Sequence, residues 1–180
     1  MIWLRNYKYI NKKTFMINLT ILTSENNFIV ENIIQYFQNY ADAKISGVIS
    51  NIDNNNIDKR LRRYKIPIKY TTQYKEMDKF LQETKSHYIL IVDYNEKIPP
   101  NFCKKYIWRM YNFKKTEKGI IVYHEKELFD NQDIIFIKNI DNVEELSLDE
   151  INDEINNLAI RFYPSLIENI IREIHKKIYK

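Results

Sequence analysis

A doubly wound α/β fold with a mostly parallel sheet is predicted for this chain of 180 residues. Short apolar runs typical of strands alternate with segments whose apolar residues recur at helical spacing. This order favours parallel pairing with helices on both faces of the sheet. Ligands of such sheets bind at the carboxyl ends of the strands, near the point where strand order reverses.

The first half of the chain carries most of the parallel sheet. Residues 1–15 show no clear periodicity and are interpreted as an N-terminal arm. Continuous apolar runs predict buried strands, and apolar residues three or four apart predict helices. The predicted strands cover 17–23, 44–50, 66–68 and 87–92, and the predicted helices start near Phe28, Ile57 and Met77.

The second half adds a hairpin and a long helical region. Pro99-Pro100 is predicted to open a helix, since proline is well placed in a first turn. An extended segment follows at 109–113, and strands at 119–124 and 133–138 form a hairpin around a polar turn. Ser147 and Glu150 make a capping-box pattern, and Pro164 is expected to split the following region into two helices.

The composition fits a single folded domain spanning residues 1–180, either alone or within a longer protein. Apolar residues make up 44% and charged residues 29% of the chain. The net charge of +4 suits an anionic small ligand such as a nucleotide, and we expect no nucleic-acid partner. The basic run at 59–63 is interpreted as a solvated helix face.

Cysteine and glycine counts narrow the function. Cys103 is the only cysteine, so an intrachain disulfide is excluded, and without a leader-like apolar run we expect a cytoplasmic protein with no membrane segment. Only two glycines occur, Gly47 and Gly119, whereas a Walker A loop or a dinucleotide fingerprint needs several. ATP hydrolysis and nicotinamide chemistry are therefore disfavoured, and no metal site is expected.

Polar residues follow the predicted parallel strands at their carboxyl ends. Because these ends meet at one edge of the sheet, we expect the residues there to bind substrate. They are Ser24, Asn26, Asn51, Asp93 and Tyr94.

Segments along the chain, in order, resemble the folate-dependent formyltransferases, which include glycinamide ribonucleotide formyltransferase and the sugar N-formyltransferases. The segments are 21–27, 47–51, 61–67, 98–102, 109–112, 119–130 and Tyr163-Pro164. The resemblance implies a Rossmann-like sheet of the formyltransferase type and acyl transfer to an amine. In that family an Asn-x-His tripeptide ends a strand and an Asp follows from a later loop.

The catalytic residues implied by this resemblance are Asn112 and Asp130, with Lys114 at the family's His position. An Asn amide can donate to an oxyanion, and an Asp can hold or deprotonate an ammonium. Lys114 can stabilise negative charge, and it can act as a base only if it is desolvated. His124 is a further candidate, one place beyond the alternation that points Tyr123 to one face.

Three departures from the family lie at the same cleft. Glu25 and Asn27 replace two glycines of the phosphate loop, and a carboxylate there repels a phosphate. Residues 93–96 occupy the place of the family's folate loop and differ from it. The family's long loop between Thr116 and Gly119 is almost absent.

Two interpretations stay open. The first is an N-acyltransferase that modifies the amine of a nucleotide-linked amino sugar, with formyltetrahydrofolate or acetyl-coenzyme A as donor. The second is a catalytically degenerate formyltransferase-like binding or interaction domain. The expected partner of the acyltransferase is a small-molecule substrate, a nucleotide sugar, and the chain is compatible with a homo-oligomer or a fused further domain.

Overall fold

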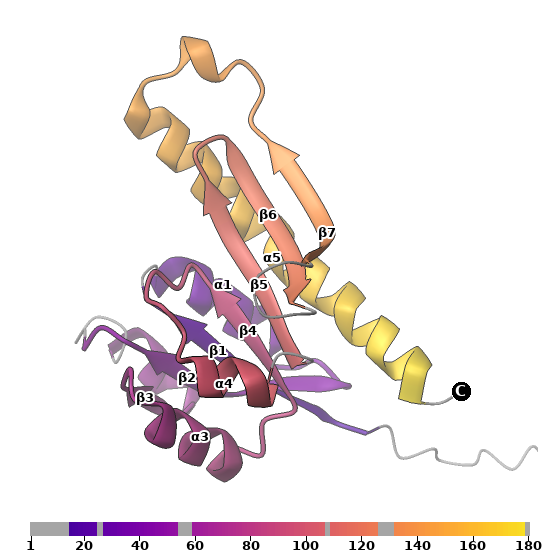
Figure 1. Cartoon of the computed structure of the whole chain (residues 1–180). Coiled ribbons are helices and arrows are strands. Elements are labelled where there is room, and N and C mark those ends of the chain that lie inside the picture. The colour runs from indigo at the N-terminus through magenta and orange to yellow at the C-terminus, as the bar shows by residue number, and fades with distance from the viewer. Residues whose placement is uncertain (1–14, 25–26, 54–58, 107–108, 126–131, 179–180) are drawn as a thin grey trace, which may run out of the picture.

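The computed structural model describes residues 15–24, 27–53, 59–106, 109–125 and 132–178. The strands in these residues are β1 (Ile17–Thr23), β2 (Ala43–Ser50), β3 (Ile68–Tyr70), β4 (Tyr88–Val92), β5 (Met110–Thr116), β6 (Gly119–Glu125) and β7 (Gln132–Asn139). They form one sheet in the order β3-β2-β1-β4-β5-β6-β7 (Figure 1). The chain runs from β1 outward to β3 and returns to β4, so strand order reverses between β1 and β4.

Parallel pairing joins β3, β2, β1, β4 and β5, whereas β6 and β7 are antiparallel. The predicted mostly parallel sheet with a hairpin in its C-terminal half is therefore confirmed. β5 continues past the predicted end at Phe113 to Thr116 and turns at Glu117 and Lys118 directly into β6. The polar residues after Phe113 belong to a strand because one side of the β5–β6 pair is exposed to solvent.

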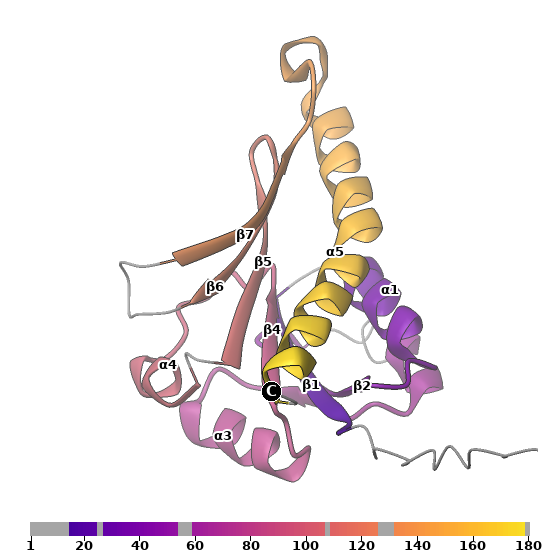
Figure 2. The same ribbon diagram turned by 90° about the vertical axis from the view of Figure 1, so that its right-hand side faces the viewer.

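Helices cover both faces of the sheet (Figure 2). The elements are α1 (Asn27–Phe37), α3 (Tyr74–Glu83), α4 (Pro100–Tyr106) and α5 (Leu148–Ile178), with short 3-10 helices η1 (Arg62–Tyr64) and η3 (Val143–Glu145). One face packs against α1 and α5 in the larger apolar core, and the other packs against α3 and α4 in the smaller core. No helix in the described ranges is long and apolar enough to cross a membrane.

Local sequence signals account for the helix boundaries. The helical spacing of Met77, Phe80 and Leu81 buries all three on α3. The capping box before α5 is confirmed: the Ser147 amide donates to the Glu150 carboxylate at 2.9 Å, and the Glu150 amide donates to the Ser147 hydroxyl at 3.3 Å. These reciprocal bonds satisfy two amides at the start of the helix.

The prediction that Pro164 splits the C-terminal region is wrong, since α5 is one helix from Leu148 to Ile178. A proline inside a helix removes one backbone hydrogen bond at a cost of about 3 kcal/mol. Here Pro164 itself is buried, and Tyr163 and Ile167 are fully buried beside it. Apolar packing of this turn against the sheet offsets the lost bond, which local propensity could not indicate.

Strands β5, β6 and β7 and the first turns of α5 extend beyond the parallel part of the sheet as a projection (Figure 1). On the face toward α5, Phe136 packs on Phe162 with ring centres 5.3 Å apart. On the other face, Ile134 and Ile137 of β7 are 57% and 52% exposed. The projection therefore has one packed face and one face open to solvent.

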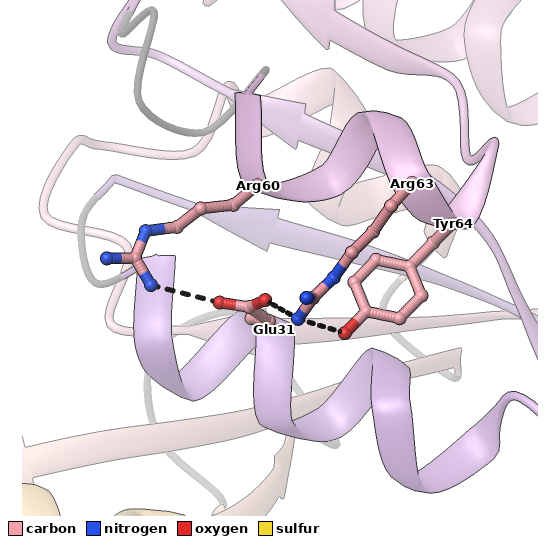
Figure 3. A network of polar contacts seen from close by, with 4 residues as sticks. All are labelled: Glu31, Arg60, Arg63 and Tyr64. Atoms are coloured by element: carbon pink, nitrogen blue, oxygen red, sulfur yellow. Dashed lines mark hydrogen bonds and ion pairs between the residues drawn. The ribbon is translucent and has the colours of Figure 1, made fainter.

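Two arginines of the predicted basic segment pair within the chain (Figure 3). Arg60 donates to the carboxylate of Glu31 on α1 at 3.0 Å, and Arg63 donates to the same carboxylate. The Arg60 guanidinium also lies 4.0 Å from the ring centre of Phe28, and Arg63 donates to the Tyr64 hydroxyl at 2.7 Å. These contacts fasten the segment before β3 to α1 and leave fewer charges for a nucleic-acid backbone.

Replacing Glu31 by Gln should lower the free energy of unfolding by about 1–2 kcal/mol, because two charge-assisted bonds at a mostly buried carboxylate are lost. The control is Glu83→Gln, since Glu83 is 59% exposed and lies 3.8 Å from Lys79. It should change stability by less than about 0.5 kcal/mol. Urea unfolding measures both, and equal losses would contradict the role given to Glu31.

Gly119, the first residue of β6, is required by the close approach of the β7 backbone. A Cβ added there would lie 2.0 Å from the carbonyl oxygen of Lys138 and 2.8 Å from the Cα of Asn139. We expect Gly119→Ala to cost about 3 kcal/mol, because strand backbone atoms must move apart. In Gly47→Ala the atoms nearest to the added Cβ are at the far edge of the Phe80 ring, which can shift. The expected loss in the free energy of unfolding is therefore about 1 kcal/mol. A smaller loss at Gly119 than at Gly47 in urea unfolding would refute this account.

Candidate functional site

The carboxyl ends of β1, β2 and β4 meet through one residue, Asn95. The Asn95 backbone amide donates to the Ser24 hydroxyl at 2.8 Å, and the Asn51 side chain donates to the Asn95 side-chain oxygen at 3.3 Å. The structure thus brings the predicted residues Ser24 and Asn51 together, while Asn26 lies outside the described residues. Asn95 was not among the predicted site residues; the polar run 93–96 directly after a buried strand was its only sequence signal.

Asp93 directly follows β4 and has the left-handed backbone conformation, with φ 47°. Its Oδ1 accepts from the Lys115 amide at 2.9 Å, and its own amide donates to the Phe113 carbonyl at 3.0 Å. Its side chain is only 9% exposed. Asp93 was predicted to bind substrate, and the structure turns its carboxylate inward. Its carboxylate and its backbone amide bond to the residues before and after Lys114 on β5.

A polar cluster continues from Asp93 toward α5. The Lys115 ammonium lies 3.8 Å from Asp93 Oδ2 and donates to the Asn156 side chain at 3.4 Å. Tyr163 is fully buried and packs edge-on against Phe113 with ring centres 5.1 Å apart. Burial, and after it the negative charge of Asp93, raises the pKa of the Tyr163 hydroxyl well above its ordinary value. The turn after β4 is therefore anchored to both β5 and α5.

Tyr94, also predicted to bind substrate, packs beside the smaller core under α3 and α4. Its hydroxyl oxygen is buried. Burial, and after it the charge of Glu96, raises the pKa of this hydroxyl. The polar end of Tyr94 thus points away from solvent.

Strand alternation sorts the catalytic candidates onto two faces. Asn112 pairs with Tyr123 and Lys114 pairs with Ile121 across the antiparallel β5–β6 ladder. Directly paired residues share a face, so these four side chains lie together, with Asn112 buried and Lys114 exposed. Asn112 and Lys114 are the two predicted catalytic residues that the structure brings to one face.

His124 lies on the opposite face of the same strand pair. It pairs with Tyr111 and stacks on its ring, with ring centres 4.6 Å apart and planes 26° apart. Together with Asp133 it lines a cavity of about 250 Å³ against α5. His124 is therefore separated from Asn112 by the sheet itself, as its place one residue beyond Tyr123 requires.

The other two histidines are also remote from Asn112. His87 Nδ1 accepts from the Asn18 backbone amide at 2.9 Å, at the amino end of the parallel strands. His175 lies in the last turns of α5. All three histidines of the chain, each within the described ranges, therefore lie off the face that carries Asn112 and Lys114.

A groove of about 730 Å³ opens on the face of Asn112 and Lys114. It follows the β5–β6 hairpin and reaches β7. Its lining residues are Lys114, Lys115, Thr116, Glu117, Lys118, Ile121, Tyr123 and Asn139. Three lysines and one glutamate make the lining cationic. Such a groove suits an anionic ligand. Asn112 is buried next to it, paired with the lining residue Tyr123.

Asp130, expected to handle the amine, falls outside the described residues. Within the described part of the chain, no group of three or more His, Cys, Asp or Glu side chains is arranged to hold a metal ion.

The role of Asp93 is tested by three substitutions that separate its bond from its backbone. Asp93→Asn keeps an acceptor oxygen and tolerates the left-handed conformation, Asp93→Gly keeps only the conformation, and Asp93→Ala keeps neither. Losses in free energy of unfolding of about 1, 2 and 3 kcal/mol are expected in that order. Amide exchange at Lys115 should accelerate in the Gly and Ala variants, and an unchanged rate would show that the bond to Asp93 is not what protects it.

Comparison with known proteins supports the architecture. No family model matches the chain, and no curated protein sequence matches it. Among solved structures, a phosphoribosylglycinamide formyltransferase from Anaplasma phagocytophilum matches with a TM-score of 0.77 and 15% identity over 87% of each chain. The corresponding enzyme of Bacillus halodurans gives 0.75 and 17% over 86% of this chain and 95% of that chain.

A third match is glycinamide ribonucleotide transformylase 1 from Symbiobacterium toebii. It has a TM-score of 0.75 and 14% identity over 88% of this chain and 89% of that chain. Identity at this level carries information about the fold alone. The expectation drawn from the resemblance of segments is confirmed at that level: the chain has a formyltransferase-type α/β fold.

Proposed function

We propose that this protein is an N-acyltransferase that modifies the amine of a small anionic substrate, a nucleotide-linked amino sugar. The observation that carries the proposal is the shared face of Asn112 and Lys114 in a formyltransferase-type fold: Lys114 lines a cationic groove, and the buried Asn112 lies directly opposite Tyr123 of the same groove. An amide donor for the oxyanion and a cationic groove for the substrate's charge are two of the features that acyl transfer to the amine of an anionic substrate needs.

The proposed step is attack of the substrate's amine nitrogen on the acyl carbonyl carbon of the donor. A carbon–nitrogen bond forms, the bond from that carbon to the donor breaks, and the proton lost by the amine passes finally to the leaving group. Asn112 donates from its amide to the oxygen that becomes negative. Asp130 accepts the amine proton in this scheme.

Lys114 acts as a cation in this proposal. Its side chain is exposed, whereas a lysine that serves as a general base requires desolvation. An exposed ammonium two residues along the strand from Asn112 attracts the negative charge of substrate into the same groove. This role differs from that of a histidine base, which the chain lacks on this face.

The acyl donor has two candidates. The printed names of the structural neighbours are formyltransferases and transformylases, which supports a formyl group and formyltetrahydrofolate as the first donor to test. Acetyl-coenzyme A is the second, because residues 93–96 differ from the folate loop of the family that the chain resembles. Net positive charge in the groove is compatible with either donor.

A second candidate function is ligand binding without catalysis. It is favoured by the position of all three histidines away from Asn112. A binding domain that has the fold and the cationic groove needs no proton acceptor beside the amide. It predicts binding of nucleotide sugars without any product.

The direct test is incubation with dTDP- and UDP-linked amino sugars and each donor, followed by mass spectrometry of the sugar. The proposal predicts a gain of one formyl or one acetyl group. Asn112→Ala should lower kcat about 100-fold, because one oxyanion donor is lost. Asn152→Ala, an exposed position on α5, is the matched control and should keep full activity. Binding without mass gain for every pair would exclude acyl transfer and favour the binding domain.

A further inference from the structure

The groove on the β5–β6 hairpin has a cationic end. Lys114 and Lys118 are both exposed and both line it, while the third lysine, Lys115, has its ammonium near Asp93 and Asn156. Two exposed ammonium groups, against the one carboxylate of Glu117 that also lines this end, favour an anionic ligand that can contact both lysines.

Both cationic residues are held by a rigid backbone. Both neighbours of Lys114 are bonded to Asp93. The Phe113 carbonyl accepts from the Asp93 backbone amide at 3.0 Å, and the Lys115 backbone amide donates to Asp93 Oδ1 at 2.9 Å. The Lys118 carbonyl accepts from the Ile140 amide at 2.7 Å, which ties the hairpin turn to the end of β7. Defined backbone positions reduce the conformational entropy that binding would otherwise cost.

The remaining lining residues are the polar Thr116, Glu117 and Asn139 and an apolar floor formed by Ile121 and Tyr123. Ile121 and Tyr123 are half-buried and lie on the same face as Lys114. Ile134 and Ile137 of β7 pair with Tyr123 and Ile121 and extend this apolar surface to the sheet edge. An aromatic side chain between isoleucines suits the flat, partly apolar ring of a nucleobase.

The usual place for a phosphate in this fold class is the turn after β1, at the start of the next helix. Here the Ser24 hydroxyl already accepts from the Asn95 amide, and Ser24 is 2% exposed. The next residue in the sequence is Glu25, a carboxylate. These features disfavour a phosphate at that turn and make the hairpin groove the better anion site.

We infer that the hairpin groove binds a nucleoside diphosphate, with the diphosphate at Lys114 and Lys118 and the base over Ile121 and Tyr123. The inference rests on the proposed function, since it names where the nucleotide part of the acyl acceptor binds. The anion site is thereby moved from the turn after β1 to the strand pair that carries Asn112.

The test is calorimetric titration of the full chain with UDP, uridine and inorganic phosphate. UDP should bind, and uridine and phosphate should each bind at least about tenfold more weakly, because each makes one part of the contacts. Lys114→Gln and Lys118→Gln should each weaken UDP binding about tenfold. Lys104→Gln, an exposed lysine on α4, makes the same charge change and should alter affinity less than about twofold.

The inference is overturned if the double variant Lys114→Gln, Lys118→Gln binds UDP as the unmodified chain does, or if Lys104→Gln weakens it equally. If phosphate binds as tightly as UDP, the nucleobase does not contact Ile121 and Tyr123 and that part of the inference is overturned. The outcomes separate from those of the acyl-transfer test: turnover with a KM unaffected by the lysine variants leaves acyl transfer standing, and removes this site and the role given to Lys114. Lysine-dependent UDP binding without turnover leaves the site and removes the proposed function.

Discussion

The pairing of β5 between β4 and β6 is the constraint on which the candidate site depends. Because side chains alternate along a strand, this pairing places Asn112 and Lys114 on one face and Tyr111, Phe113 and Lys115 on the other. Asp93 reinforces the arrangement with bonds to the carbonyl before Lys114 and the amide after it. One face is thereby committed to packing against α5, and the exposed part of the other, from Lys114 to the turn, is available to a ligand.

The two faces of the projection divide structural and chemical roles. Toward α5, Phe113 and Tyr163 pack in the larger core, and the Lys115 ammonium lies beside the carboxylate of Asp93. Toward the groove, the exposed Lys114 and Lys118 lie beside Ile121 and Tyr123, and Tyr123 pairs with the buried Asn112. A short turn at Glu117 and Lys118 makes this possible, because no long loop lies between β5 and β6.

Much of the fold was predictable from local patterns, and the departures have physical causes. The apolar runs of β1 and β4 and the Ser147–Glu150 box are local signals, and the structure confirms them. The single helix through Pro164 depends on packing against the sheet. The site was less predictable: the bond that turns Asp93 inward joins residues 22 apart, and that between Ser24 and Asn95 joins residues 71 apart. His124 could be assigned to a face only once the register of β6 against β5 was known.

The most direct test of the account is to map where the acyl acceptor binds, by following backbone amide signals during titration with a UDP-linked amino sugar. The account predicts that the largest shifts fall on residues 112–123 of β5 and β6, on both sides of the turn at Lys118. Shifts concentrated instead at Ser24, Asn51 and Asn95, or around His124 and α5, would contradict the assignment of the Asn112–Lys114 face as the functional surface.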